Sequence, residues 1–460
     1  MPLYRVSLNG VARWYYMRTR FAFTSRLMLS QPGTTRQMEA VGSSRFFLDA
    51  ASNTLFKLVA DKYTVRRHPI KWWIRDILEK RLLGGFDALK EWRANACIRR
   101  AGLRAIECRG VGVALLYGGG AEKSLLYTAD GLRQRGHVVK VFILRDKIEH
   151  RLPEGLEIEN LGVINRFSKL FSSIWVEKWQ AKRIARALST FGPDVVLSCS
   201  CDKITRHLTF PNLWFWIKSD ISAKFSDPGK RTKAFNKVHR FYSGRNVVAV
   251  SQGVKDNLLN VIGLQPAEIR AIYNPYEREP FLRMAEESAP VPDGEYLINV
   301  GTFEARKRHD RLLRAYKTSG VTTPLVLLGK GKGDEEANLR AMIEDMGLAE
   351  RVILPGYQTN PYPFIRNAKA LILTSDAEGL PRALIESLLL GTPVVSVDCP
   401  SGPREILSGE LAAFLVPLED ETALADAIAR MDAAPITVTE AHYRPFLKET
   451  VLPQFEALAK

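Results

Sequence analysis

The sequence predicts an α/β fold with two doubly wound domains in tandem that face a cleft, preceded by a mostly helical basic extension. Short apolar segments alternate with helical patterns from about residue 106 onward, as in parallel sheets that are covered on both faces. A proline-rich stretch without periodicity divides these segments into two series. The surplus of positive charge is concentrated before residue 111.

The charge distribution separates a basic extension from a near-neutral body. The chain has 460 residues and a net charge of +16, and a chain of this length accommodates two or three domains. Residues 1–110 contain 21 Lys+Arg and 8 Asp+Glu, whereas residues 111–460 contain 45 and 42. With 46% hydrophobic and 25% charged residues, the composition is typical of globular proteins and excludes a disordered or collagen-like chain.

Neither a membrane span nor a secretory signal is predicted. No run reaches the ~18 apolar residues that a spanning helix needs, and arginines interrupt residues 11–29, where a signal peptide would be apolar. The arginine-rich start also resembles an organellar transit peptide, an alternative that stays open. The scattered cysteines favour reduced thiols in a cytoplasmic chain without a zinc site. They are Cys97, Cys108, Cys199, Cys201 and Cys399.

In the extension, residues 1–105, the clearest helical pattern covers residues 72–92. Apolar side chains recur there at helical spacing among basic residues. They include Trp73, Ile77, Leu78, Leu82, Phe86 and Leu89. Basic residues attract anionic lipid, and tryptophan and tyrosine suit the membrane interface. This composition predicts a peripheral membrane contact through residues 1–105, with a soluble cap as the alternative.

The first series of strands and helices occupies residues 106–275. Strands are expected at residues 111–117, 138–144, 195–198, 247–250 and 269–273, with a helix at 121–135. Between the first strand and that helix lies Gly118-Gly119-Gly120. Glycines allow a ligand to approach the backbone, and a helix N-terminus favours an anion. A plain tight turn is an equal alternative for this loop.

Residues 276–295 form the predicted linker, because residues 274–295 contain four prolines and little periodicity. The second series covers residues 296–440, with strands expected at 296–300, 325–328, 352–354, 370–374 and 394–396. Ligands of such sheets bind beyond the carboxyl ends of the strands. The loops at those ends are therefore the candidate site.

Two loops of the second series suit phosphate groups. Residues 301–308 (GTFEARKR) place a glycine and three consecutive cations directly after a strand, and residues 329–333 (GKGKG) follow the next one. Cations and glycine at one sheet edge indicate a diphosphate site. The alternative is a solvated basic helix start.

The most informative segment is residues 378–386 (EGLPRALIE). Pro381 suits the first helical position, so the amides of Gly379 and Leu380 lie near a helix N-terminus with partial positive charge. At 1.5 Å rise per residue, roughly 10 Å separates Glu378 from Glu386. A glycosidase pair flanks one bond from opposite sides, ~5 to 9 Å apart. A clamp on an elongated ligand is therefore favoured, with a capped surface helix as the alternative.

Together these motifs resemble glycosyltransferase family 4, retaining nucleotide-sugar transferases of the GT-B fold with two Rossmann-like domains. The resemblance covers about residues 108–460. Its motifs are the two-glutamate segment 378–386, Gly356-Tyr357, Ser375, and residues 391–395 (GTPVV), 399–405 (CPSGPRE), 118–122 (GGGAE), 135–137 (RGH), 249–254 (AVSQGV) and 273–275 (YNP). It also implies that residues 441–460 form a helix that crosses back to the first domain.

The resemblance implies a role for each matching residue. Glu378 and Lys307 would be catalytic, acting on the donor sugar and on the leaving diphosphate. Residues on the acceptor side would be Gly119, Gly120 and Lys218. The donor-binding residues would be Gly301, Thr302, Arg306, Gly329, Tyr357, Gly379, Leu380, Arg382 and Glu386.

Two positions depart from the family pattern. Thr302 stands where the family usually has arginine, and Arg306, Arg308 or Arg382 would have to supply that cation. The acceptor-side loop that often carries a histidine corresponds to residues 214–220 (WFWIKSD), and the nearest histidine, His207, is expected to be structural. An electrophilic clamp without one of its members is expected to be slower.

The resulting prediction is transfer of a hexose-type sugar from a nucleoside diphosphate, UDP in the first instance, to a glycan or lipid-linked saccharide. Envelope polysaccharide or lipopolysaccharide synthesis is the expected setting. No Asp-x-Asp occurs, so neither metal nor cofactor is expected, and nucleic-acid binding has no motif to support it. The alternatives are a weakened GT-B paralogue that acts as a scaffold and a nucleotide-sugar epimerase.

Overall fold

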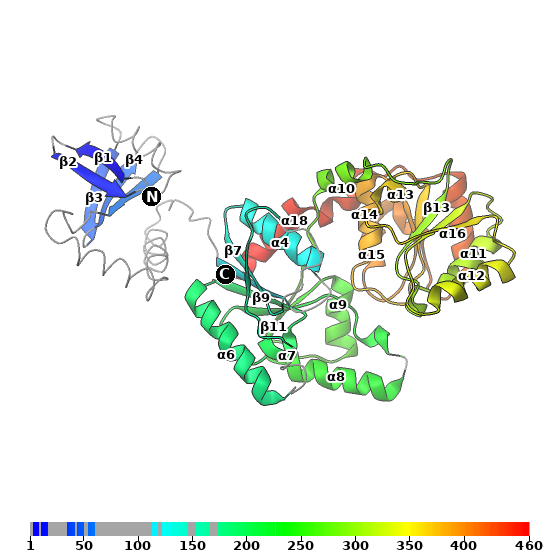
Figure 1. Cartoon of the computed structure of the whole chain (residues 1–460), viewed down its shortest axis with the longest axis horizontal. Coiled ribbons are helices and arrows are strands. Elements are labelled where there is room, and N and C mark those ends of the chain that lie inside the picture. The colour runs from blue at the N-terminus through cyan, green and yellow to red at the C-terminus, as the bar shows by residue number, and fades with distance from the viewer. Residues whose placement is uncertain are drawn as a thin grey trace. The chain divides into compact units, whose positions relative to one another are not determined.

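The computed structural model describes residues 3–8, 11–16, 35–41, 44–49, 54–59, 112–117, 122–145, 153–165, 173–225 and 227–459. The chain divides into two compact units. One comprises Met1–Gly110 with Ser189–Gly192, and the other Val111–Leu188 with Pro193–Lys460. The second unit contains both large sheets of the protein (Figure 1).

The described residues of the basic extension are strands, so the expectation of a mostly helical extension is wrong for them. β1 (Leu3–Leu8) pairs with β2 (Val11–Tyr16), and β4 (Ser44–Asp49) pairs with β3 (Thr35–Val41) and β5 (Thr54–Val59), all antiparallel. Asn9-Gly10 separates β1 from β2, and this dipeptide is the strongest short signal for a hairpin. The helix expected at residues 72–92 lies outside the described residues.

The first large sheet has seven parallel strands in the order β12-β11-β10-β9-β6-β7-β8. The expected strands correspond to β6 (Gly112–Tyr117), β7 (Val138–Ile143), β9 (Val195–Cys199), β11 (Asn246–Ala249) and β12 (Glu268–Ala271). Two further strands were not expected, β8 (Glu157–Asn160) at one edge and β10 (Leu213–Ile217) inside the sheet. All five residues of β10 are buried.

The first half of the body is the part that contains this seven-stranded sheet, and the second half contains the other large sheet. Helices connect the parallel strands of the first half, as crossovers require. They are α4 (Glu122–Gln134), α6 (Ile174–Phe191), α7 (Asp202–Thr205), α8 (Pro228–Tyr242) and α9 (Gln252–Asp256). A short 3-10 helix, η1 (Ser222–Lys224), precedes α8, and a π-helical turn, η2 (Asn257–Val261), follows α9. Cys199 and Cys201, for which reduced thiols were expected, are buried free thiols.

The second large sheet has six parallel strands in the order β15-β14-β13-β16-β17-β18. They are β13 (Leu297–Val300), β14 (Leu325–Leu328), β15 (Val352–Gly356), β16 (Ala370–Leu373), β17 (Val394–Val397) and β18 (Leu415–Val416). All but the two-residue β18 were expected. Two parallel sheets with helical crossovers confirm the predicted doubly wound architecture.

Most helices of this half alternate with its strands. They are α11 (His309–Thr318), α12 (Glu335–Asp345), α13 (Tyr362–Arg366), α14 (Arg382–Leu390), α15 (Pro403–Ile406) and α16 (Glu421–Ala433), with the 3-10 helices η3 (Ala305–Lys307) and η4 (Gly409–Phe414). The segment expected to be an aperiodic linker contains a helix, α10 (Arg278–Ala285). It forms because Phe281 and Ala285, four residues apart on one face, are both buried.

The chain ends in α17 (Glu440–Tyr443), η5 (Arg444–Phe446), α18 (Lys448–Glu456) and η6 (Ala457–Ala459). α18 lies beside α4 (Figure 1), and Val451, Leu452 and Phe455 join the core of the first sheet. The ring of Phe455 meets that of Trp216 edge to face, with 5.0 Å between centroids. The C-terminus therefore packs on the first half although it follows the second in sequence.

Among the helices that the structure describes, none is both long and apolar enough to cross a membrane.

Candidate active site

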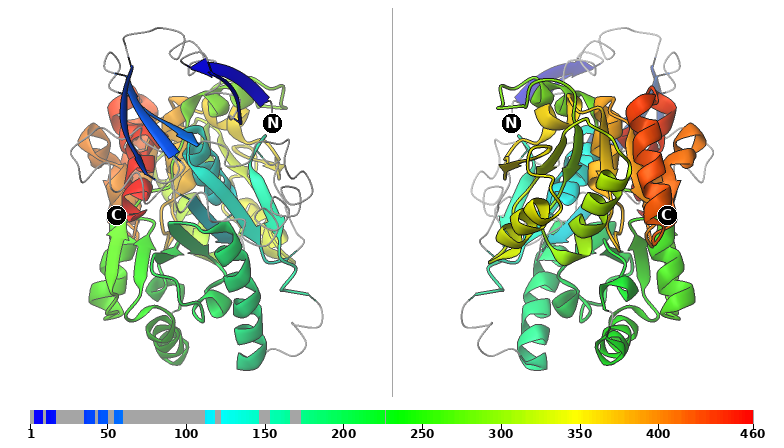
Figure 2. Two further views of the ribbon diagram at one scale, coloured as in Figure 1. Left: turned by 90° about the vertical axis from the view of Figure 1, so that its left-hand side faces the viewer. Right: turned by 90° about the vertical axis from the view of Figure 1, so that its right-hand side faces the viewer.

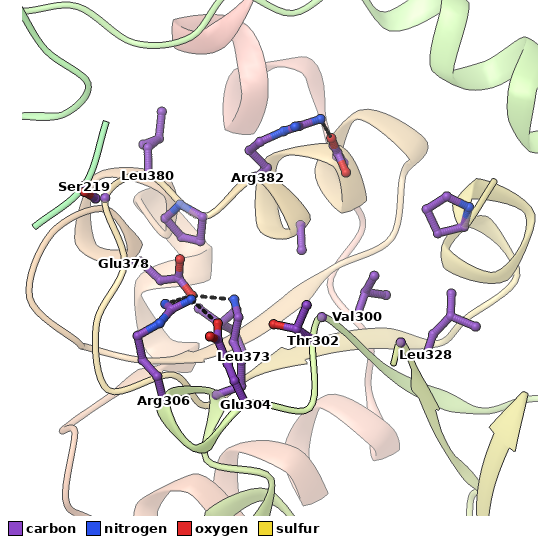
Figure 3. A pocket seen from close by; sticks show the side chains of 18 of the residues that line it. Ser219, Val300, Thr302, Glu304, Arg306, Leu328, Leu373, Glu378, Leu380 and Arg382 are labelled. Atoms are coloured by element: carbon purple, nitrogen blue, oxygen red, sulfur yellow. Dashed lines mark hydrogen bonds and ion pairs between the residues drawn. The ribbon is translucent and has the colours of Figure 1, made fainter. Parts of the chain in front are cut away.

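A cavity of about 1010 Å³ opens at the carboxyl ends of β13, β14 and β16, and residues that follow β10 of the first sheet also line it (Figure 3). Twelve of the residues singled out by sequence line it: Lys218, Gly301, Thr302, Arg306, Lys307, Gly329, Tyr357, Glu378, Gly379, Leu380, Arg382 and Glu386. Gly119 and Gly120 lie outside the described residues. The predicted cleft between the two halves is this cavity.

A carboxylate and two cations meet in the cavity. Lys307 Nζ lies 2.7 Å from Glu378 Oε1. Arg306 Nη1 lies 3.3 Å from the same oxygen (Figure 3). Arg306 Nη2 also donates to Glu304 Oε1 over 2.6 Å. Burial lowers the pKa of Arg306, but Glu378 and Glu304 outweigh this and raise the pKa above its ordinary value. The cluster keeps charges of both signs at one point of the wall.

The loop after β13 holds its cations through backbone contacts. Thr374 Oγ1 donates to the Lys307 carbonyl over 3.0 Å, and the Asp376 amide donates to the Arg306 carbonyl over 2.9 Å. Both partners follow β16, so the two loops are tied together at the sheet edge. Arg308 ends the turn η3 with φ of 53°, in the left-handed region that few non-glycine residues adopt.

Arg308 turns away from the cavity, so it does not supply the cation that Thr302 replaces. Its guanidinium binds Asp310 and Asp376, each over 3.0 Å. Arg306 remains as the arginine of this loop that lines the cavity. Thr302 itself also lies in the cavity wall (Figure 3).

The N-terminus of α14 forms a second wall of the cavity. Gly379 and Leu380 precede Pro381 at this helix start, so their amides lie where the helix dipole is positive. Arg382 Nη2 lies 2.7 Å from Glu386 Oε1, one turn along the helix. Burial lowers the pKa of Arg382, but Glu386 reverses the effect and the net shift is upward. Each of the two glutamates of the motif is thus ion-paired.

Glycines also line the cavity at the point where β13 and β14 end. A Cβ on Gly329 would lie 1.7 Å from the carbonyl oxygen of Gly301, so no other residue fits where the ends of β13 and β14 converge. Beyond them, Tyr357 is 58% exposed, and Lys330 Nζ lies 4.2 Å from the centre of its ring. This arrangement offers an accessible aromatic face at one end of the cavity.

The two halves are in contact at one edge of the cavity, where Gly379 meets the loop after β10. A Cβ on Gly379 would lie 2.3 Å from the carbonyl oxygen of Lys218 and 2.8 Å from the Cα of Ser219. Ser251 Oγ, from the first half, donates to the Gly379 carbonyl over 2.6 Å. This contact explains why the loop after β10 forms part of the wall.

A second contact between the halves was not foreseen. The carboxylate of Glu405 accepts hydrogen bonds from the backbone amides of Gln252 and Gly253, over 2.7 and 2.8 Å. Ser401 Oγ donates to Asp220 Oδ2 over 2.9 Å. The motifs at residues 249–254 and 399–405, which are far apart in sequence, therefore meet in space. Only their shared resemblance to one family hinted at this contact.

The expected acceptor-side loop is a strand up to Ile217, and the three residues that follow, Lys218, Ser219 and Asp220, line the cavity. Lys218 is held there by polar and aromatic partners. Its Nζ donates to Ser124 Oγ over 2.8 Å and to Asn274 Oδ1 over 2.7 Å, and it lies 3.0 Å from the centre of the Trp216 ring. These partners carry no formal charge.

Burial is the main cause that lowers the pKa of Lys218, to about 7. Arg382 lowers it further, whereas Cys199 acts in the opposite direction. A lysine in this environment changes its charge near neutral pH. His207 hydrogen-bonds Glu177 over 2.9 Å and does not line the main cavity, as expected of a structural histidine.

In the part of the chain that the structure describes, no group of three or more His, Cys, Asp or Glu side chains is arranged to hold a metal ion.

Two family models match successive parts of the chain. Residues 118–279 match the model described as glycosyltransferase family 4, and residues 283–439 match glycosyl transferases group 1. Together they cover the second sheet, the first sheet except β6, and the residues that line the cavity.

Two curated relatives share 30% of the matched residues with this chain. A Campylobacter jejuni N-acetylgalactosamine-N,N'-diacetylbacillosaminyl-diphospho-undecaprenol 4-alpha-N-acetylgalactosaminyltransferase is 30% identical over 39% of this chain and 49% of its own length. An Escherichia coli lipopolysaccharide 1,6-galactosyltransferase is 30% identical over 36% of this chain and 47% of its own length. The chain thus spans about half the length of these curated relatives.

Among solved structures, an Anabaena protein in complex with UDP, Alr3699/HepE, superposes with a TM-score of 0.57 at 18% identity. The match covers 75% of this chain and 98% of that protein. At this identity the likeness establishes the fold, which is the GT-B arrangement of two Rossmann-like domains.

The lowered pKa of Lys218 predicts that the free energy of unfolding depends on pH. Between pH 7 and about 10.5 the unfolded chain binds a proton at this lysine that the folded chain has lost. Raising the pH through this range should therefore stabilise the wild type relative to the Lys218→Met variant. Chemical denaturation of both proteins at pH 7 and pH 10 measures this, and equal pH dependence would contradict the assignment.

Proposed function

The chain belongs to the glycosyltransferases that combine a family 4 domain with a group 1 domain, and on this premise we propose that it is a retaining hexosyltransferase. The donor is a nucleoside diphosphate sugar, specifically a UDP-sugar. The acceptor is a glycan or lipid-linked saccharide of cell-envelope polysaccharide or lipopolysaccharide synthesis. The observation that carries this proposal is that one cavity is lined by Lys307, Glu378, Glu386 and the N-terminus of α14.

The cavity offers a complementary group for each part of such a donor. Arg306, Lys307 and the N-terminus of α14 supply the positive potential that a diphosphate requires. Glu386 accepts hydrogen bonds from the ribose hydroxyls, and the exposed ring of Tyr357 packs against the base. Glu378 then faces the sugar, next to the cations that bind the diphosphate.

The proposed reaction breaks the bond between the anomeric carbon and the diphosphate oxygen. The acceptor hydroxyl attacks from the same face, and its proton passes to the leaving diphosphate, so the anomeric configuration is retained. Lys307 and Arg306 stabilise the negative charge that develops on the leaving group. No metal ion or cofactor takes part in this proposal, because these side chains supply the positive charge.

The acceptor class rests on the relatives. The names of two of them contain diphospho-undecaprenol and lipopolysaccharide, and a structural neighbour is in complex with UDP. Acceptors of this kind lie at a membrane, so we place the protein in the cytoplasm, peripheral to the membrane. The basic residues 1–105 are one proposed contact with that surface.

One observation favours a second function. Thr302, which replaces the usual arginine, lines the cavity, so a weakened paralogue that binds donors as a scaffold has a physical basis.

The donor class and the enzyme activity are tested together. A panel of nucleotide sugars should raise the melting temperature for the true donor, because a bound ligand stabilises the folded state. We expect slow release of the nucleoside diphosphate from that donor without acceptor, measured by a coupled assay. Stabilisation without any release would support the scaffold, and no stabilisation by any member would contradict the donor site.

The Lys307→Ala variant tests the site itself. Loss of one charge that stabilises the leaving group should lower kcat by about 100-fold, equal to ~2.7 kcal/mol. The control is Lys317→Ala, which removes an exposed lysine of α11 outside the cavity and should leave kcat unchanged. Both variants are compared in steady-state turnover with the stabilising donor, and full activity of the Lys307 variant would refute its role.

A further inference from the structure

The outward face of α6 combines aromatic and basic side chains. Trp175 is 78% exposed and Trp179 is 52% exposed, on the same face of the helix. Lys178 Nζ lies 5.7 Å from the centre of the Trp175 ring, and Arg183 lies 5.4 Å from that of Trp179. Two neighbouring tryptophans with so much exposed apolar surface are uncommon where a surface contacts only water. In Figure 2, α6 is the long blue-green helix on the outside of the first half.

The same face carries no acidic side chain. Glu177, the one carboxylate of α6, is buried and paired with Arg206 over 2.7 Å and with His207 over 2.9 Å. The exposed positions of the helix include Ile174, Trp175, Lys178, Trp179, Lys182, Arg183 and Arg186. The helix therefore presents four cations, two tryptophans and an isoleucine to the outside.

A small cavity opens beside this face. It has a volume of about 240 Å³, and Lys178, Lys182 and His207 are among the residues that line it. Two lysines beside one hollow attract an anionic group such as a phosphate.

The charge of the body also favours an anionic partner on the side of its first half. Residues 111–275 contain 25 Lys+Arg and 14 Asp+Glu, whereas residues 276–460 contain 20 and 28. The body that is near-neutral in total is therefore basic in its first half and acidic in its second. An anionic surface attracts the half that carries α6 and repels the other.

We propose that α6 is a docking surface for an anionic lipid bilayer, distinct from the basic extension. Trp175 and Trp179 enter the headgroup region, where the amphipathic indole ring is favoured. The lysines and arginines around them pair with lipid phosphates, at about 1 kcal/mol for each cation near the surface. Tryptophans among the cations suit the headgroup region of a bilayer, and the RNA arm of the test below covers stacking of bases on the same rings. The proposal does not depend on the sugar-transfer activity.

The chain contains a matched control in α8. This helix carries Lys230, Arg231, Lys233, Lys237 and Arg240 and no acidic residue, yet no exposed tryptophan. Replacing two lysines in either helix by glutamine changes the net charge equally. Only the α6 change removes cations that flank tryptophans.

The test is co-sedimentation of the full chain with vesicles of phosphatidylcholine, with and without phosphatidylglycerol. The full chain keeps the contribution of residues 1–110 the same in every variant. Lys178→Gln/Lys182→Gln should lower the partition coefficient about fivefold for each lysine, from ~1 kcal/mol per cation. Trp175→Ala/Trp179→Ala should lower it as well and reduce the quenching of tryptophan emission by brominated lipid to what the other tryptophans of the chain contribute. The α8 variant Lys230→Gln/Lys233→Gln should bind like the wild type.

Three outcomes would overturn the proposal. Unchanged partitioning of the tryptophan variant would mean that another part of the chain makes the contact. An equal loss in the α8 variant would mean that attraction is spread over the basic surface. Binding to single-stranded RNA that matches vesicle binding would assign the face to nucleic acid. The replaced side chains are exposed, so matching circular dichroism is expected to exclude misfolding.

Discussion

The close approach of Gly379 to the Lys218 carbonyl is the contact on which the site depends. A Cβ on this glycine would lie 2.3 Å from that backbone oxygen, so there is no room for any side chain. The same glycine receives a hydrogen bond from Ser251 of the first half and lies at the N-terminus of α14. One residue therefore joins the two halves and presents an amide to the cavity. The walls of the donor site keep their spacing because this contact holds.

Charge in the cavity follows from the same geometry. Glu378 and Glu386 flank the start of α14, and each is paired with a cation, Lys307 in the first case and Arg382 in the second. Unpaired carboxylates would repel a diphosphate, whereas paired ones leave the helix terminus attractive to it. The cavity can thus combine acceptors for sugar hydroxyls with a site for an anion.

The alternation of apolar segments predicted most of the two sheets, because buried parallel strands are nearly continuous in apolar residues. β10 was missed since its residues were assigned to an acceptor loop, and β8 since charged residues alternate along an edge strand. The site residues were found because their motifs follow strand ends. The sequence did not predict the ion pair of Arg382 with Glu386 or the hydrogen bonds of Glu405 to the amides of Gln252 and Gly253, since both depend on side-chain positions. The strands of the extension were also missed, although Asn9-Gly10 marks a hairpin.

Calorimetric titration with UDP, comparing wild type and Gly379→Ala, tests most directly whether this contact assembles the donor site. Overpacking costs ~1–3 kcal/mol, so the variant should bind UDP about tenfold more weakly or worse. Gly229→Ala is the control, because a Cβ on Gly229 of α8 would meet only Asp227, at an ordinary 3.5 Å. Weaker binding by Gly379→Ala alone is the predicted result. Equal affinity of all three proteins would contradict the account.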